Sequence, residues 1–80
     1  MMIDLGRVAI ELYDIVKIAK FDEIVGFFKK TRKFYLLITF RYNVLGNSSD
    51  KMFYLYKTEA ERDKYYDMIL KEINQYNQDN

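Results

Sequence analysis

The chain has 80 residues, of which 13 are basic and 12 acidic, for a formal net charge of +1. A chain of this length buries one small core and leaves little room for a deep pocket, so we expect residues 1–80 to form a single domain. Histidine and cysteine are absent, which removes the commonest general base, the usual zinc ligands, thiol nucleophiles and disulfides. We therefore expect no enzyme activity, no metal site and no cofactor.

The first residues lack the pattern of a signal peptide, and no apolar run approaches about 20 residues. We expect a soluble, cytoplasmic protein. The residue usage is rich in Lys, Ile, Asn, Tyr and Phe and lacks Pro and Trp, which is typical of an AT-rich genome. This composition suggests a bacterium of low GC content or its phage as the source.

Residues 7–28 fit two patterns. A helical stripe would use Val8, Leu12, Ile15 and Ala19, whereas strands would alternate through Val8, Ile10 and Leu12 and then Val16 and Ile18. We favour strands, because β-branched residues are dense and no helix cap precedes the segment. Residues 24–28 have the same ambiguity: Asp22 is a candidate cap, and Gly26 weakens a helix there.

The clearest strand covers residues 34–44, where every second residue is apolar: Phe34, Leu36, Ile38, Phe40, Tyr42 and Val44. A turn-forming segment follows at residues 45–50, and residues 52–57 return as a second strand. Phe53 and Leu55 share one face of this returning strand, while Met52, Tyr54 and Tyr56 share the other. The two strands are predicted to form an antiparallel hairpin.

A helix is predicted over residues 58–73, beginning at Thr58 and ending at Ile73. The Thr58 side chain can accept the Glu61 N–H, and the Glu61 carboxylate can accept the Thr58 N–H in return. One apolar stripe should pack on the sheet: Tyr66, Ile69, Leu70 and Ile73. Five charged residues should face water: Glu59, Glu61, Arg62, Lys64 and Lys71. Residues 74–80 lose the periodicity and should be a frayed tail.

These elements predict an α+β fold in which an antiparallel sheet of about four to five strands is packed on one face by the C-terminal helix. If the hairpin pairs as expected, one set of residues should occupy the face opposite the helix: Tyr35, Leu37, Met52, Tyr54 and Tyr56. Tyrosine and methionine with few charges are typical of interface cores. The set is therefore a candidate protein-binding surface or homodimer contact, or else a second core layer beneath the N-terminal segment.

A second candidate site is basic. Lys29, Lys30, Arg32 and Lys33 precede the clearest strand, with aromatic residues on both sides, and Arg41 continues the set. Such a segment can contact the phosphates of nucleic acid or of an anionic lipid surface, or it can be a solvated turn that protects a strand edge. Scattered carboxylates and isolated glycines form no catalytic or phosphate-cradling motif.

Residues 52–70, MFYLYKTEAERDKYYDMIL, resemble the last strand and closing helix of pleckstrin-homology-like domains, with Tyr66 where that family commonly has an aromatic residue. The resemblance implies a strand-rich sheet closed by one helix. It also implies that the basic segment corresponds to that family's phosphate-binding loop.

The function that the sequence favours is non-enzymatic binding of another protein, as a phage or bacterial regulator or inhibitor of a host system. The alternative is binding of nucleic acid or anionic lipid through the basic segment.

Overall fold

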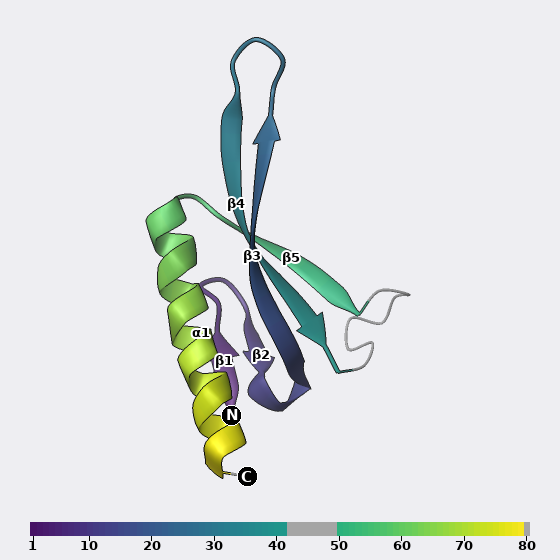
Figure 1. Ribbon diagram of the computed structural model, residues 1–80, viewed down its shortest axis with the longest axis vertical. Helices are drawn as coiled ribbons and strands as arrows, with labels where there is room; N and C mark the ends of the chain where they lie inside the picture. The colour runs from purple at the N-terminus through teal and green to yellow at the C-terminus, as the bar shows by residue number, and fades with distance from the viewer. Residues whose placement is uncertain (42–49, 80) are drawn as a thin grey trace.

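The computed structural model describes residues 1–41 and 50–79, with side chains through residue 76. Five strands, one 3₁₀ turn and one long helix follow one another along the chain (Figure 1): β1 (Met2–Asp4), β2 (Ala9–Glu11), η1 (Leu12–Asp14), β3 (Ile15–Val25), β4 (Thr31–Phe40), β5 (Lys51–Tyr56) and α1 (Glu59–Asp79). The predicted α+β class is confirmed. The preference for strands over helices in the N-terminal part is also confirmed, because β2 and β3 occupy most of it.

The strands form two antiparallel sheets rather than the single sheet that the sequence predicted. β3, β4 and β5 pair in that order, whereas β1 pairs with β2 alone. The β1–β2 hairpin lies beside the helix (Figure 1) and buries Ile3 and Leu5 in the core. The hairpin is joined to the rest of the molecule by these apolar side chains and by hydrogen bonds of its turn to Tyr54 and Tyr56 of β5.

The predicted hairpin between the fourth and fifth strands is confirmed in the described part of the chain. Residues on the apolar stripe of β4 face β5 directly, with Leu36 opposite Tyr54 and Ile38 opposite Met52. β4 begins at Thr31, earlier than expected, and is described as far as Phe40. The expected continuation through residues 42–44 and the turn at residues 45–49 lie outside the described residues.

The core fills the space between the inner face of this sheet, the helix and the β1–β2 hairpin. Leu36 and Ile38 from β4 are fully buried, as is Ile69 from α1. Every second residue of β4 points inward, which explains why the alternation of that strand located the core correctly.

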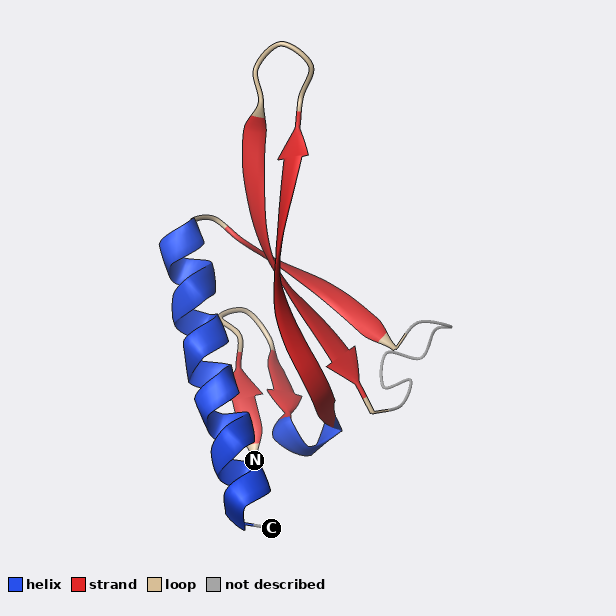
Figure 2. Cartoon of the chain, in the orientation of Figure 1, coloured by secondary structure: helices blue, strands red, loops and turns tan. Residues whose placement is uncertain are grey.

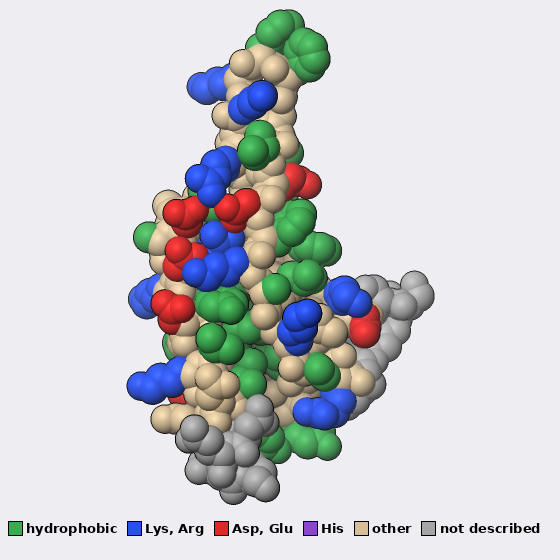
Figure 3. Space-filling model, viewed as in Figure 1, with side chains coloured by type: hydrophobic (Ala, Val, Ile, Leu, Met, Phe, Trp, Pro, Cys, Tyr) green, Lys and Arg blue, Asp and Glu red, His purple; other side chains and the backbone are tan. Residues whose placement is uncertain are grey.

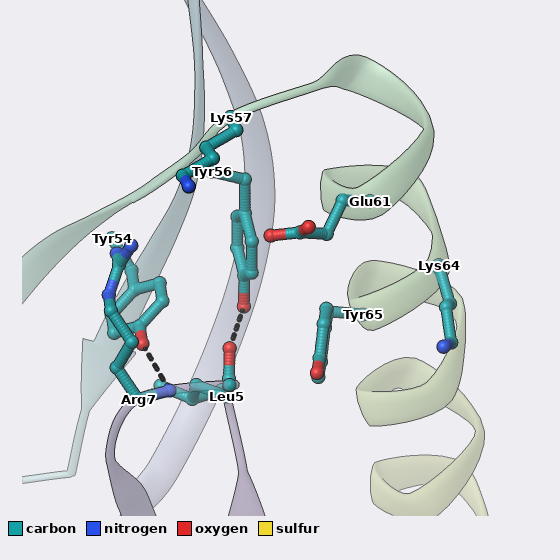
Figure 4. A pocket seen from close by; sticks show the side chains of 9 residues that line it. Leu5, Arg7, Tyr54, Tyr56, Lys57, Glu61, Lys64 and Tyr65 are labelled. Atoms are coloured by element: carbon teal, nitrogen blue, oxygen red, sulfur yellow. Dashed lines mark hydrogen bonds between the residues drawn. The ribbon is translucent and has the colours of Figure 1, made fainter.

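The helix is longer than predicted, and it packs on the core through three of the four predicted residues, Tyr66, Ile69 and Ile73. Thr58 caps it as expected, since its Oγ1 accepts the Glu61 N–H at 3.1 Å, but the Glu61 carboxylate turns toward Tyr56 instead of back to Thr58 (Figure 4). The helix ends at Asp79 rather than at Ile73, because residues 74–79 contain neither Gly nor Pro. Tyr76, although exposed, lines the same small hollow as Ile73.

Two side chains of the helix lie opposite to expectation. Arg62, predicted to face water, is only 3% exposed, whereas Leu70, predicted to pack, is exposed. The buried series is therefore Arg62, Tyr66, Ile69 and Ile73, with spacings of three to four residues.

β3 and β4 continue beyond the first turn of the helix as a two-stranded arm that ends in a tight loop (Figure 2). The arm lies along the longest dimension of the molecule, which measures 50 × 29 × 19 Å. Gly26 starts the loop with a φ of +107°, and a β-carbon there would lie 2.2 Å from the Lys29 carbonyl oxygen. Only glycine fits this bend.

Candidate binding surfaces

The outer face of the three-stranded sheet, turned away from the helix, carries a patch of contacting aromatic rings. Residues opposite one another in the ladder share a face, so Phe21, Tyr35 and Leu55 form one row and Ala19, Leu37 and Phe53 the next. The Phe53 ring meets Phe21 at a centroid distance of 5.4 Å and Tyr35 at 6.0 Å, both edge to face. Phe53 nevertheless remains 55% exposed. These two rows are called the outer-face patch below.

Charged rows lie at both ends of the outer-face patch. Lys17, Thr39 and Lys51 form the row at one end, and Glu23 opposite Lys33 forms the row at the other. Among the described strand residues of these rows, Glu23 is the single acid. The patch is therefore apolar at its centre and predominantly basic at its rim.

The five residues predicted to share the face opposite the helix do not share it. Tyr35 and Leu37 lie in the outer-face patch, whereas Met52, Tyr54 and Tyr56 point to the helix side, and both tyrosines are buried. The register explains the difference: Tyr35 pairs with Leu55, which puts the odd-numbered residues of both strands on the outer face.

Tyr54 and Tyr56 instead line a hollow of about 380 Å³ between the β1–β2 turn and the first half of α1 (Figure 4). The Tyr56 hydroxyl donates to the Leu5 carbonyl at 2.8 Å, and the Tyr54 hydroxyl accepts the Arg7 N–H at 2.8 Å. The Tyr56 ring stacks on Tyr65 with centroids 5.1 Å apart. Burial raises the pKa of Tyr56, so its hydroxyl keeps the proton that it donates. These contacts give both tyrosines a structural role.

The predicted basic set is also divided by the fold. Lys29 and Lys30 are exposed in the loop of the arm, and Lys33 lies in the rim of the outer-face patch. Arg32 points to the inner side and binds Asp22 at 2.6 Å. Arg41 lies beyond the far end of β4, where its Nε donates to the Tyr13 carbonyl. Thus only Lys29 and Lys30 remain together as a candidate phosphate contact.

Arg62 is the centre of an ionic cluster that joins the helix to the base of the arm. Its Nη1 donates to Asp22 at 2.6 Å and its Nε to Asp63 at 2.7 Å. Arg32 binds Asp22 from the other side and reaches Glu59 at 3.0 Å. The hydrogen bond from Arg62, followed by that from Arg32, lowers the pKa of Asp22, and the bond from Arg62 likewise lowers the pKa of Asp63.

This cluster has a structural role, because it links the helix to the base of the arm. Its cations and carboxylates satisfy one another, and no buried side-chain nitrogen or oxygen in residues 1–41 and 50–76 lacks a partner. The part of the chain that the structure describes also contains no group of three or more acidic residues placed to hold a metal ion. Across the same described ranges, no helix is both long and apolar enough to cross a bilayer.

No protein-family model, curated protein or solved structure matches this chain. The resemblance of residues 52–70 to pleckstrin-homology-like domains therefore stays a prediction. The strand and helix that carry it correspond to β5 and α1. Four strands precede them, of which β1 and β2 form one sheet and β3 and β4 join β5 in the other.

Four residues of the outer-face patch were not among the predicted site residues: Ala19, Phe21, Phe53 and Leu55. The sequence places Phe53 on one face of its strand with Leu55, but it does not show which residues of the neighbouring strand share that face. Ala19, Phe21 and Glu23 share one face of β3, but because one of them is charged the pattern does not indicate an apolar outer face. Only the ladder brings the rings of β3, β4 and β5 together.

Proposed function

We propose that this chain is a non-enzymatic protein-binding module that contacts its partner through the outer-face patch. The observation that carries the proposal is the contact of three rings, Phe21, Tyr35 and Phe53, on a sheet face where Phe21 and Phe53 stay exposed. Aromatic side chains at the centre of a polar rim are typical of the residues that dominate binding energy at interfaces.

The rim indicates what the partner should look like. Lys17, Lys33 and Lys51 surround the rings, and Glu23 is the single acid among the described strand residues of these rows. Asp50, which precedes β5, forms an ion pair with Lys51 at 3.3 Å. In a two-fold homodimer the same surface meets itself, so these lysines would face one another and repel. A partner with an apolar centre and an acidic rim would be complementary, which favours a different protein over a second copy.

The absence of histidine and cysteine from the whole sequence supports the non-enzymatic part of the proposal. The tyrosine-lined hollow supports it too, because the Tyr54 and Tyr56 hydroxyls are already bonded to the backbone. Regulation or inhibition of a host system by a phage or bacterial protein remains the biological setting that we propose for such a module.

A photocrosslinking experiment tests this proposal. A benzophenone-bearing phenylalanine at position 53 should crosslink to one defined protein in cells of the natural host, while the same probe at Met68, which is exposed on the helix, should not. Purified partner should then bind the wild-type chain and lose affinity as salt rises. Equal crosslinking from both positions would contradict the proposal, and a crosslink only to a second copy would replace the partner with a homodimer.

A further inference from the structure

The loop of the arm carries the most exposed large apolar side chains of the described structure. Phe27 is 87% exposed and Phe28 is 96% exposed. Their rings contact each other edge to face, at a centroid distance of 4.8 Å. Figure 3 shows hydrophobic side chains at the end of the arm, with Lys and Arg side chains just below them. Two phenylalanines in water are unfavourable for the free protein, so this loop is a candidate contact site in its own right.

The bend of the loop depends on Gly26. Gly26 occupies a backbone conformation that favours glycine, and the Lys29 carbonyl packs where a side chain would stand. At the base of the arm, Asp22 is bound by Arg32 from β4 and by Arg62 from the helix. The ion pairs thus join the base of the arm to the helix, and the glycine turn places the two rings at its far end.

Charge is distributed in a definite order behind the rings. Residues 24–33 contain four basic residues and no acidic residue. Arg32 is engaged by Asp22 and Glu59, whereas Lys29 and Lys30 take part in none of the ion pairs among the side chains described, in residues 1–41 and 50–76. Two lysines outside these ion pairs therefore directly follow two exposed phenylalanines in the chain.

We propose that the end of the arm inserts into the surface of an anionic lipid bilayer, with Phe27 and Phe28 among the acyl chains and Lys29 and Lys30 at the lipid phosphates. A bilayer offers an apolar interior beneath a layer of negative charge, and the arm presents the matching order of side chains. A nucleic acid would match less well, because rings at 88° to each other cannot both stack on neighbouring bases. The loop is remote from the ring contacts of the outer-face patch, so this inference does not depend on the proposed function.

The first test is sedimentation with vesicles of phosphatidylcholine alone and of phosphatidylcholine with about a third phosphatidylserine. The wild-type chain should bind the anionic vesicles and not the neutral ones. The double variant Phe27→Ala/Phe28→Ala should lose on the order of 100-fold in affinity, from the apolar surface no longer buried. Met68→Ala/Leu70→Ala, which removes exposed apolar side chains from the helix, should bind as the wild type does.

The lysines have a matched control on the helix. Lys29→Gln/Lys30→Gln should weaken binding roughly 30-fold, because each cation near an anionic surface contributes a factor of about 5. Lys64→Gln/Lys71→Gln changes the net charge equally on exposed helix positions and should have a much smaller effect. Equal losses from both pairs would show attraction by net charge alone and would overturn the assignment to the loop.

A fluorescent reporter tests insertion directly. The chain has no tryptophan, so Phe28→Trp places a single indole at the end of the arm. Its emission should shift to the blue with anionic vesicles and be quenched by brominated acyl chains. Unshifted emission would overturn insertion, as would absence of binding to any vesicle. Binding of single-stranded DNA that depends on the same four residues, without vesicle binding, would assign the loop to nucleic acid. Inorganic phosphate that displaces the chain would reduce the site to a phosphate contact.

Discussion

The two faces of the three-stranded sheet both carry apolar side chains, but these differ in exposure. The inner face contributes Leu36 and Ile38, which are completely buried beneath the helix, whereas the outer face exposes Phe21 and Phe53. Apolar side chains on an inner face stabilise the fold, and an exposed cluster of rings marks a surface suited to a partner. The difference indicates that the core of this small domain lies on one side of its sheet, and it supports our proposal that the other side binds a partner.

The largest effect should come from a cavity on the inner face. Ile38→Ala removes a side chain with no exposed surface and should lower the free energy of unfolding by about 2–5 kcal/mol. Leu37→Ala, one residue away on the outer face, is the matched control and should cost less than half as much. Urea denaturation measures both, and equal losses would mean that the two faces contribute alike to stability.

A smaller loss is expected at the contact between the helix and the arm. Arg62→Met keeps most of the buried side-chain volume but removes the bonds to Asp22 and Asp63. Because hydrogen bonds to charged groups contribute free energy of this order, the variant should lose about 2 kcal/mol of unfolding free energy. Lys64→Met, on the exposed side of the same helix, should change stability little. An Arg62→Met variant as stable as the wild type would show that the ionic cluster orients the arm without stabilising the fold.

The outer-face patch should separate binding from stability. Phe53→Ser removes the central ring of the patch, and because that ring is half exposed the variant should lose less than about 1 kcal/mol of unfolding free energy. The free energy of binding to the partner should weaken by much more than this. Thermal unfolding together with titration of the purified partner measures both quantities. Unfolding of the variant would show instead that the patch is a second core layer.

The smallest expected effect is the acid dependence of the ionic cluster. The pKa values of Asp22 and Asp63 are lowered in the folded state by bonds from Arg62. Stabilisation from these carboxylates is therefore complete above the unfolded-state pKa of about 3.9 and is lost as the pH falls through the lowered folded-state values. Urea unfolding below about pH 4 should show this decline, and Asp22→Asn should flatten it. A decline as steep in the variant would place the acid sensitivity elsewhere.

The sequence predicted those features that depend on neighbouring residues. The alternation of β4 located the core, and Thr58 marked the start of the helix, because a strand face and a helix cap are both set within a few residues. The end of the helix was predicted too early because the residues after Ile73 are mostly polar, although residues 74–79 contain neither Gly nor Pro.

The features that sequence reasoning missed depend on residues far apart in the chain. Whether Tyr35 shares a face with Tyr54 is decided by the register, and a shift of one residue exchanges the two faces. Arg62 could not be recognised as buried because its partner Asp22 lies 40 residues earlier. The separation of β1 and β2 from the larger sheet likewise depends on tertiary packing.

The hydrogen bond from Tyr56 to the Leu5 carbonyl spans 51 residues and has a consequence for the order of folding. The β1–β2 hairpin precedes β5 in the chain, so it is synthesised before the strand whose Tyr56 holds it. Contacts of such sequence separation form late, because the chain between them must first be ordered. During translation Ile3 and Leu5 should therefore remain exposed to water until β5 has left the ribosome.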